Sequence, residues 1–455
     1  MNYDFAKFTA SQVTGRELGV EIVQYAECGG LRPRNGEAQW TDGVLEGTTE
    51  ATQHGLDASA FAPPLAAFVF CFIEGRQALL GPVLSTEQDD ALFGELSERE
   101  IAWRDRQLFL QSRGYMLRPR LRPDWRPSWI SPRKSILESE DAVPLPFRNH
   151  LVDATRLRDG EMVYIKRVTT DDSEVRIATY LSQDLFRQDP HNHSVPILDL
   201  FQDSENPDIL YMVMPFLSLA DQPPFNTVGE VVDFCDQVLE GLVFMHDHGV
   251  AHRDCAMKNL MFDSSAIFPQ GHHPIFESFL PDFVTVAPRL SRTAAGGVKY
   301  YFVDFGMSSY FPPDAPRLAL GDEVRDQEVP ELSETIPYDP FKVDIFALGN
   351  VFRRELYDLF SNLSFLKPLI DPMLSPDHAA RPTVTQAWEK WIAVRGGISM
   401  AHKSWRVRKR KEMVAETVVL DVVALGRVGW GVGSGEVGCG VVISKPREPF
   451  VKGSS

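Results

Sequence analysis

Two short motifs constrain this chain more than any other part of its sequence. The first runs from His252 to Asn259 and joins a His-Arg-Asp triplet to an asparagine. The second, Asp304-Phe305-Gly306, ends an apolar, strand-like stretch that begins at Tyr300. An aspartate carboxylate can accept the proton of a hydroxyl group, and aspartate and asparagine oxygens can hold Mg²⁺. The two motifs therefore predict a site at which a hydroxyl group meets a magnesium-bound phosphate.

The order of these motifs resembles that of the eukaryotic protein kinase family. Downstream, Pro330-Glu331 resembles the end of the family's activation segment, Asp344–Gly349 its buried helix, and Arg381 the late arginine that pairs with that glutamate. The resemblance covers about residues 138–397. It implies an α+β fold of two lobes, a small β-rich N-lobe and a large helical C-lobe.

The resemblance also assigns roles to the polar residues of the two motifs. Asp254 would be the catalytic base, and Asn259 and Asp304 would be the magnesium ligands. Lys258, which follows Asp254 in the same loop, would be a further phosphate contact. The implied reaction transfers the γ-phosphoryl group of ATP to a protein hydroxyl, with ATP and Mg²⁺ as cofactors and a protein substrate as partner. The sequence leaves the acceptor open between serine, threonine and tyrosine.

A β-hairpin is expected upstream of these motifs. Alternating apolar residues predict strands over 151–157 and 162–168. Lys166 ends a Val-Tyr-Ile-Lys run that resembles the family strand whose lysine holds the α- and β-phosphates. The stretch 173–181 predicts a short helix, and its Glu174 is the candidate carboxylate that positions Lys166.

The adenine side of the site is expected at the apolar stretch 209–217. By resemblance, Met214 would lie at the back of the adenine pocket. Phe216 and Leu217 would form the hinge and offer backbone groups to the base. Tyr164 stands where the family has a small alanine against the adenine ring, so its phenol is expected to intrude on the base.

The glycine-rich loop of the family is missing. Counting back from Lys166 places Pro144, Pro146 and Asn149 at the positions of the three glycines. Proline has no N–H to donate to a phosphate and makes a loop stiff. Two functions therefore stay open, a protein kinase and a pseudokinase that acts as a binding or scaffolding module. A small-molecule kinase is a weaker third reading, because the Pro-Glu and late arginine belong to the protein-kinase large lobe.

Further elements are expected between and after the motifs. Apolar residues at three- and four-residue spacing predict a helix over 227–248. An insertion near 264–298 contains His272-His273, which we interpret as part of a polar loop and not as a metal site. Acidic residues at 322–328 are either a substitute for a phosphate clamped by Arg253 or a solvated loop.

The domain prediction has three parts. Residues 1–131 form a partly disordered N-terminal extension with a helix from Glu98 and an Arg/Pro/Trp arm near 98–129. Residues 132–397 form the protein-kinase-like domain, and residues 398–455 form a basic, then Gly/Val-rich, flexible tail. The arm alternates Arg with Trp, and we expect it to pack on the protein and not to bind nucleic acid.

Composition narrows the function classes. The net charge of −17 makes nucleic acid an improbable partner, and the five scattered cysteines form no zinc or disulfide pattern. The longest apolar run, residues 65–73, is too short to span a bilayer, and no signal peptide is evident. We therefore expect an intracellular protein, cytoplasmic or nuclear, without a membrane partner.

Overall fold

The computed structural model describes residues 90, 93–130, 135–146 and 150–433, except the side chains of 423 and 425–433. It also gives the backbone of four short strands, β1 (Phe5–Thr9), β2 (Val13–Thr14), β3 (Glu21–Ile22) and β4 (Tyr25–Gly29). The chain divides into two compact units. Unit 1 draws on residues 1–104, 119–145 and 282–284, and unit 2 on residues 105–118, 146–281 and 285–455.

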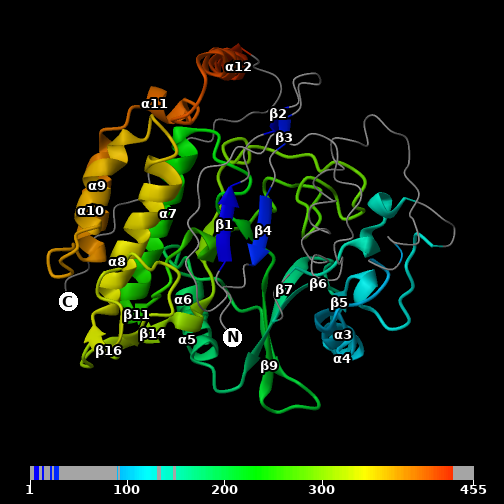
Figure 1. The fold of residues 1–455 in the computed structure, drawn as a ribbon. Coiled ribbons are helices and arrows are strands. Elements are labelled where there is room, and N and C mark those ends of the chain that lie inside the picture. The colour runs from blue at the N-terminus through cyan, green and yellow to red at the C-terminus, as the bar shows by residue number, and fades with distance from the viewer. Residues whose placement is uncertain are drawn as a thin grey trace, which may run out of the picture. The chain divides into compact units, whose positions relative to one another are not determined.

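Unit 2 contains a five-stranded antiparallel sheet in the order β5-β6-β7-β9-β8 (Figure 1). Its strands are β5 (Tyr115–Leu117), β6 (Leu151–Arg156), β7 (Met162–Thr169), β8 (Asp199–Gln202) and β9 (Ile209–Pro215). The predicted hairpin is β6–β7, and Gly160 permits its turn with a φ of 79°. Residues of β7 alternate between the two faces of the sheet, so Tyr164 and Lys166 share one face.

The sheet takes its edge strand from a part of the chain that we assigned to the N-terminal extension. Tyr115 pairs with Arg156 and Leu117 with Ala154. The predicted single helix from Glu98 is also divided, into α3 (Glu98–Arg104) and α4 (Gln107–Ser112). The boundary between the units falls at this break, after Arg104.

Most of the described helices lie in the rest of unit 2. The helices are α5 (Ser173–Leu181), α6 (Asp184–Arg187), α7 (Val228–Asp247), α8 (Pro340–Val351), α9 (Lys367–Met373), α10 (Val384–Gly396), α11 (Met400–Ser404) and α12 (Val414–Gly433). The predicted long helix is α7, which begins after Thr227, whose hydroxyl accepts a hydrogen bond from the Glu230 N–H at 3.2 Å. Figure 1 shows α7, α8, α9 and α10 gathered together. Mixed helix and antiparallel sheet agree with the predicted α+β class.

Short strands hold the loops that carry the two motifs. A three-stranded sheet joins β10 (Ser218–Leu219), β12 (Leu260–Phe262) and β13 (Tyr300–Phe302). Two further pairs are β11 (Val250–Ala251) with β14 (Ser309–Tyr310), and β15 (Ala319–Gly321) with β16 (Ser333–Tyr338). Because β12 follows the first motif and β13 precedes the second, their pairing brings the two motifs together.

Unit 1 confirms that the Arg/Pro/Trp arm packs on the protein. Arg120 is buried and its Nε donates to Glu100 Oε1 at 2.6 Å. The indole N–H of Trp125 donates to Asp141, and that of the buried Trp129 donates to Asp90, each at 2.9 Å. Internal hydrogen bonds thus fix these three side chains of the arm within unit 1.

The insertion 264–298 is not the polar loop that we predicted. His272 and His273 are buried, and Ile267 and Phe268 belong to the hydrophobic core of unit 2. Arg292 is buried too, and its Nη2 donates to the carbonyls of Ala220 at 2.9 Å and Pro223 at 2.7 Å. The apolar residues and the arginine therefore fix the insertion to the segment that follows the hinge.

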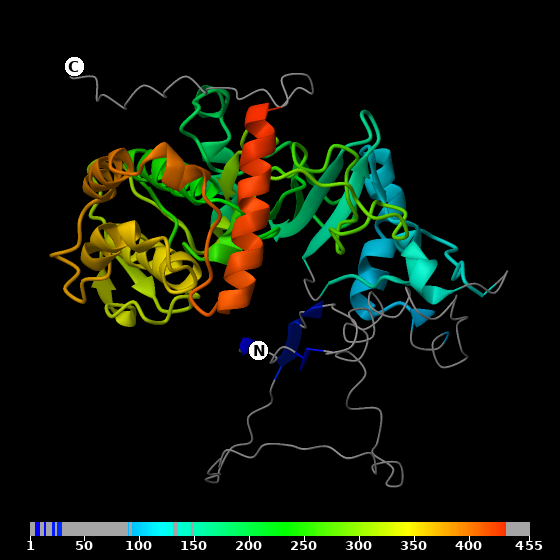
Figure 2. The same cartoon turned by 90° about the horizontal axis from the view of Figure 1, so that it is seen from above.

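The C-terminal region is also more ordered than predicted. Figure 2 shows α12 as one continuous helix. Two arginines before it form ion pairs: Arg406 binds Glu412 at 2.8 Å and Asp421 at 2.6 Å, and Arg408 binds Asp421 as well. None of the described helices is both long and apolar enough to cross a membrane. Residues 434–455 of the predicted tail lie outside the described residues.

Candidate active site

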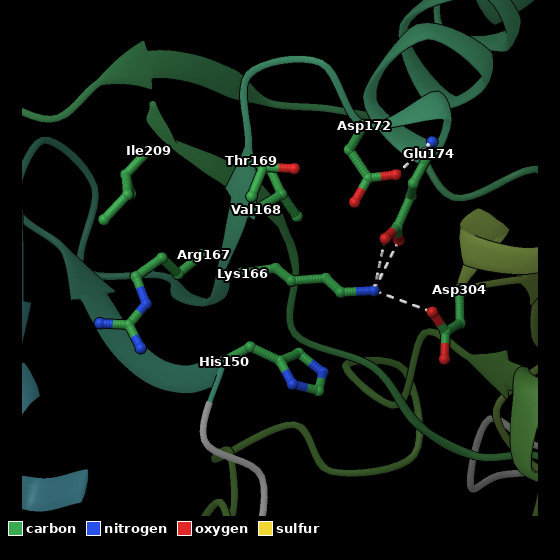
Figure 3. Close-up of a pocket in the computed structure, with 9 residues that line it drawn as sticks. All are labelled: His150, Lys166, Arg167, Val168, Thr169, Asp172, Glu174, Ile209 and Asp304. Atoms are coloured by element: carbon green, nitrogen blue, oxygen red, sulfur yellow. Dashed lines mark hydrogen bonds and ion pairs between the residues drawn. The ribbon is translucent and has the colours of Figure 1, made fainter. Parts of the chain in front are cut away.

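Lys166 is the centre of a buried ionic cluster. Its Nζ lies 2.6 Å from Glu174 Oε1 and 2.8 Å from Glu174 Oε2. The same atom lies 2.8 Å from Asp304 Oδ1. Figure 3 shows the lysine side chain extended toward both carboxylates. One ammonium therefore joins the sheet, helix α5 and the Asp-Phe-Gly motif.

The pairing of Lys166 with Glu174 follows from a tight connection between β7 and α5. The strand ends at Thr169, and Asp172 caps the helix by accepting a hydrogen bond from the Glu174 N–H at 2.9 Å. Glu174 thus lies in the first turn of α5, where the positive end of the helix favours a carboxylate. The short sequence spacing between Lys166 and Glu174 is long enough for the contact.

The charges of this cluster shift one another's pKa. Burial disfavours the Lys166 ammonium, but the Glu174 and Asp304 carboxylates raise its pKa above the ordinary value. Burial also disfavours the Asp304 carboxylate, yet Lys166, with a further contribution from Arg325, lowers its pKa. Burial raises the pKa of Glu174, because removal from water outweighs the attraction of Lys166. Lys166 and Asp304 are therefore held in their charged forms.

Asp344 holds the backbone of the loop that contains the His-Arg-Asp triplet. The Asp344 carboxylate, which is fully buried, accepts hydrogen bonds from the backbone N–H of His252 at 2.8 Å and of Arg253 at 2.6 Å. It also lies 2.9 Å from His246 Nε2. Arg253 has a left-handed φ of 66°, a conformation that costs a non-glycine residue about 1–3 kcal/mol. The buried carboxylate stabilises this strained backbone.

Asp254 and Asn259 form a second polar pair in the same loop. The Asn259 amide nitrogen donates to the Asp254 carboxylate at 2.7 Å and to its backbone carbonyl at 2.9 Å. The Asp254 carboxylate also accepts from Arg325, a residue that the sequence analysis did not single out. The sequence marks Arg325 only as a single positive charge among the acidic residues 322–328. Lys258 is exposed in the turn Met257–Asn259.

A magnesium ion would find suitable oxygens between the two motifs. The amide nitrogen of Asn259 makes the hydrogen bonds, which leaves its amide oxygen as a possible ligand. Asp304 offers a carboxylate on a side chain that is 40% exposed. Hard oxygen ligands of this kind, completed by phosphate and water, suit Mg²⁺. Within the described residues, no group of three or more His, Cys, Asp or Glu side chains could hold a metal ion.

A cavity of about 590 Å³ adjoins this ionic cluster (Figure 3). His150 lies beside Lys166 in it, and its ring points in the same direction as the lysine side chain. Sequence reasoning missed His150, because nothing in its neighbourhood resembles the family loop. The residues that line the cavity are His150, Lys166, Arg167, Val168, Thr169, Asp172, Glu174, Ile209 and Asp304.

No short loop connects β5 to β6, where the family has its glycine-rich loop. The chain leaves unit 2 after Arg118 and returns to it at Pro146. Between these points it forms three single turns, Pro119–Leu121, Ile136–Glu138 and Glu140–Ala142. Pro144 and Pro146 lie in this connection, and Asn149 lies outside the described residues. In the described part of this connection, three single turns therefore stand where the family has a short loop.

Aromatic rings occupy the side of the site on which the base is expected. The Tyr164 ring lies 4.7 Å from the Phe216 ring, centre to centre. His272 of the insertion lies 5.4 Å from Phe216 and 4.4 Å from Phe268. Burial lowers the pKa of His272, which favours its neutral form. We call Tyr164, Phe216, Phe268 and His272 the aromatic cluster.

Met214 and Leu217, predicted for the adenine pocket and the hinge, lie at and just after the end of β9. Met214 pairs with Tyr164 across β7 and β9 and is partly buried. Leu217 is buried in the core of unit 2. The strand end thus presents Met214 and Phe216 beside Tyr164.

The activation-segment expectation is only partly correct. Arg381 forms the expected ion pair, with its two Nη atoms 2.5 Å and 2.8 Å from the Glu331 carboxylate oxygens. Arg253, however, does not bind the acidic run, because its Nη2 donates to the Leu320 carbonyl at 2.6 Å and to the Tyr338 hydroxyl at 2.8 Å. The acids Asp326 and Glu328 pair instead with Arg354, at 3.0 Å and 2.8 Å.

No model of a known protein family matches the chain. Cyclin-dependent kinase D-1 of Arabidopsis thaliana is 27% identical to the chain over 116 residues. The match covers 24% of this chain and 28% of the plant kinase, so the similarity spans little more than a quarter of that relative. This partial similarity suggests a protein kinase relationship.

Proposed function

We propose that this chain is a protein kinase of bilobal fold that transfers the γ-phosphoryl group of ATP to a protein hydroxyl. The observation that carries the proposal is the arrangement of Lys166, Glu174 and Asp304 about one ammonium, at 2.6–2.8 Å. Phosphoryl transfer depends on positioned charge, because the enzyme must stabilise negative charge on the transferred group. A fixed ammonium beside a metal-binding carboxylate meets that need.

Each polar residue then has a task in the transfer. Lys166, held by Glu174, would bind the phosphates of the nucleotide, with His150 beside it in the same cavity. Asp254 would orient the acceptor hydroxyl and take its proton as the hydroxyl oxygen bonds to the γ-phosphorus and the bond to ADP breaks. Mg²⁺, when bound, would neutralise charge on the phosphates, and Asn259 and Asp304 are the residues that would hold it.

The proposal is tested by thermal unfolding of the purified chain with ATP, with and without Mg²⁺. A bound nucleotide stabilises the folded state as its concentration exceeds the Kd. We expect a Tm rise that requires Mg²⁺, that disappears in Asp304→Asn and that survives in Asp254→Asn. Phosphotransfer from labelled ATP should then be present in the wild type and reduced at least a hundredfold in Asp254→Asn.

A specific observation favours a second function, that of a pseudokinase acting as a binding module. The contact between Tyr164 and Phe216 fills the base side, and no glycine-rich loop covers the phosphates. Absence of any Tm change up to millimolar ATP would favour this second function. A Tm change without phosphotransfer in the wild type would favour a nucleotide-binding scaffold.

A further inference from the structure

Arg325 lies directly on the proposed catalytic base. Its Nε is 3.1 Å from Asp254 Oδ2, and its backbone N–H donates to Asp254 Oδ1 at 2.9 Å. Resting on the proposed function, we propose that the Arg325 side chain occupies the place of the acceptor hydroxyl. The guanidinium must release Asp254 before an acceptor can bind, so Arg325 gates the acceptor subsite.

The hydrogen bonds of Asp254 show why an acceptor and Arg325 compete. Oδ2 accepts from Arg325 Nε and also from the Asn259 amide at 2.7 Å. An ionised carboxylate oxygen has about two acceptor positions, so both positions of Oδ2 are in use. Asp254 is only 8% exposed, which leaves little approach from other directions. Oδ1 accepts one hydrogen bond, from the Arg325 backbone N–H. An acceptor hydroxyl that approaches Oδ2 therefore has to replace one of its two donors.

Buried neighbours hold the backbone on both sides of Arg325, whereas its side chain is half exposed and is held by Asp254. Asp326 is buried and binds Asn350 at 2.6 Å and Arg354 at 3.0 Å. Val324 is buried as well. The Arg325 side chain is 48% exposed, so its charge can move into water at small cost. The backbone N–H would then continue to orient Asp254 while the guanidinium leaves Oδ2 to the hydroxyl.

The first test compares acceptor kinetics in Arg325→Gln and in the control Arg317→Gln. Arg317 lies in the same segment, but its contact is with the Phe341 ring, 4.6 Å away. The probe is a pool of synthetic peptides with a central serine, threonine or tyrosine, at saturating MgATP. We expect kcat/KM for the pool to rise about threefold to tenfold in Arg325→Gln, with the nucleotide KM unchanged, and no rise in the control.

The opposite result separates gating from catalysis. A fall in kcat in Arg325→Gln would identify the guanidinium as a phosphate ligand in the transition state and overturn the gate. An unchanged kcat/KM would overturn it as well. If neither wild type nor variant binds MgATP or transfers phosphate, the proposed function fails and the gate fails with it. If both proteins bind MgATP and transfer phosphate but acceptor kinetics are unchanged in Arg325→Gln, the proposed function stands and only the gating role of Arg325 fails.

A second test measures the hydrogen bond between the Arg325 backbone and Asp254 and does not depend on phosphotransfer. Amide hydrogen exchange of peptides covering residues 320–329 is compared in wild type and Asp254→Ala. Because Asp254 accepts the Arg325 N–H, its removal should accelerate exchange in these peptides, while exchange in α10 stays unchanged. Equal exchange rates in the two proteins would show that Asp254 does not hold Arg325 in solution.

Discussion

The two sides of the candidate site are built from different chemistry. The phosphate side consists of Lys166, Glu174 and Asp304, joined by charge-assisted hydrogen bonds of 2.6–2.8 Å. The base side is the aromatic cluster, in which Tyr164 and Phe216 lie 4.7 Å apart. The first arrangement is specific in direction and distance, whereas the second depends on packing of rings.

This difference teaches where the chain can tolerate change. Buried charges need every partner, because one unpaired charge costs several kcal/mol. Aromatic rings can shift or part with a smaller loss, since each pair contributes about 0.5–1.5 kcal/mol beyond burial. Single substitutions among the aromatic rings should therefore be tolerated, whereas a single substitution among the three charged residues should disrupt all of their contacts.

The largest expected effect concerns neither side but the support of the loop that carries Asp254. Asp344→Ala leaves the His252 and Arg253 N–H groups without their acceptor, and we expect the free energy of unfolding to fall by about 3–5 kcal/mol. Urea unfolding measures it. Asp371→Ala is the control, because the solvent-exposed Asp371–Lys367 pair should contribute little to stability. Similar losses in the two variants would contradict the supporting role of Asp344.

Removal of the central cation tests the phosphate side directly. Lys166→Met leaves two carboxylates without their ammonium, so we expect a loss of about 1–3 kcal/mol in unfolding free energy and at least a tenfold loss in MgATP affinity. Calorimetric titration and urea unfolding give the two values. Arg176→Met, an exposed site on the same helix as Glu174, should change neither. Unaltered nucleotide binding in Lys166→Met would refute its assignment.

The base side should respond in the opposite sense. Tyr164→Ala removes one ring of the contact with Phe216 and opens space, so MgATP affinity is expected to rise about threefold to tenfold. The free energy of unfolding should fall by only about 0.5–1.5 kcal/mol. Tyr164→Phe keeps the ring and should leave the affinity unchanged. If Tyr164→Ala weakens binding instead, the ring is part of the base pocket and not an obstacle.

The smallest effect is the pH dependence of the phosphate side. The pKa of Lys166 is raised above 10.5 in the folded chain, mainly by the Glu174 and Asp304 carboxylates acting against burial. Its contribution to stability is therefore complete below about pH 10.5 and is lost as the pH rises through the folded value. The difference in unfolding free energy between wild type and Lys166→Met should stay constant from pH 8 to 10 and narrow above that. A difference that narrows below pH 9 would contradict the raised pKa.

The parts of the site that follow from local patterns were predictable. The stripe of α7 and the β6–β7 hairpin each have a signal in residue spacing, whereas the pairing of Arg381 with Glu331 was implied by the resemblance to the protein kinase family. The positions of β5 and His272 depend on segments far away in the chain, so no local pattern encodes them. Arg325 was hidden for another reason, because its acidic neighbours dominate the composition of that segment.

The pairing of β5 with β6 has a consequence for how the protein is made. Tyr115–Leu117 leaves the ribosome well before its partner Leu151–Arg156, and a whole folded segment is synthesised in between. Until that partner appears, β5 has no neighbour, and a truncated chain that starts at residue 132 would expose β6 as a bare sheet edge. Such edges recruit other chains. Attempts to trim the protein to its predicted kinase-like domain should therefore start upstream of Asp105, because shorter forms are expected to aggregate.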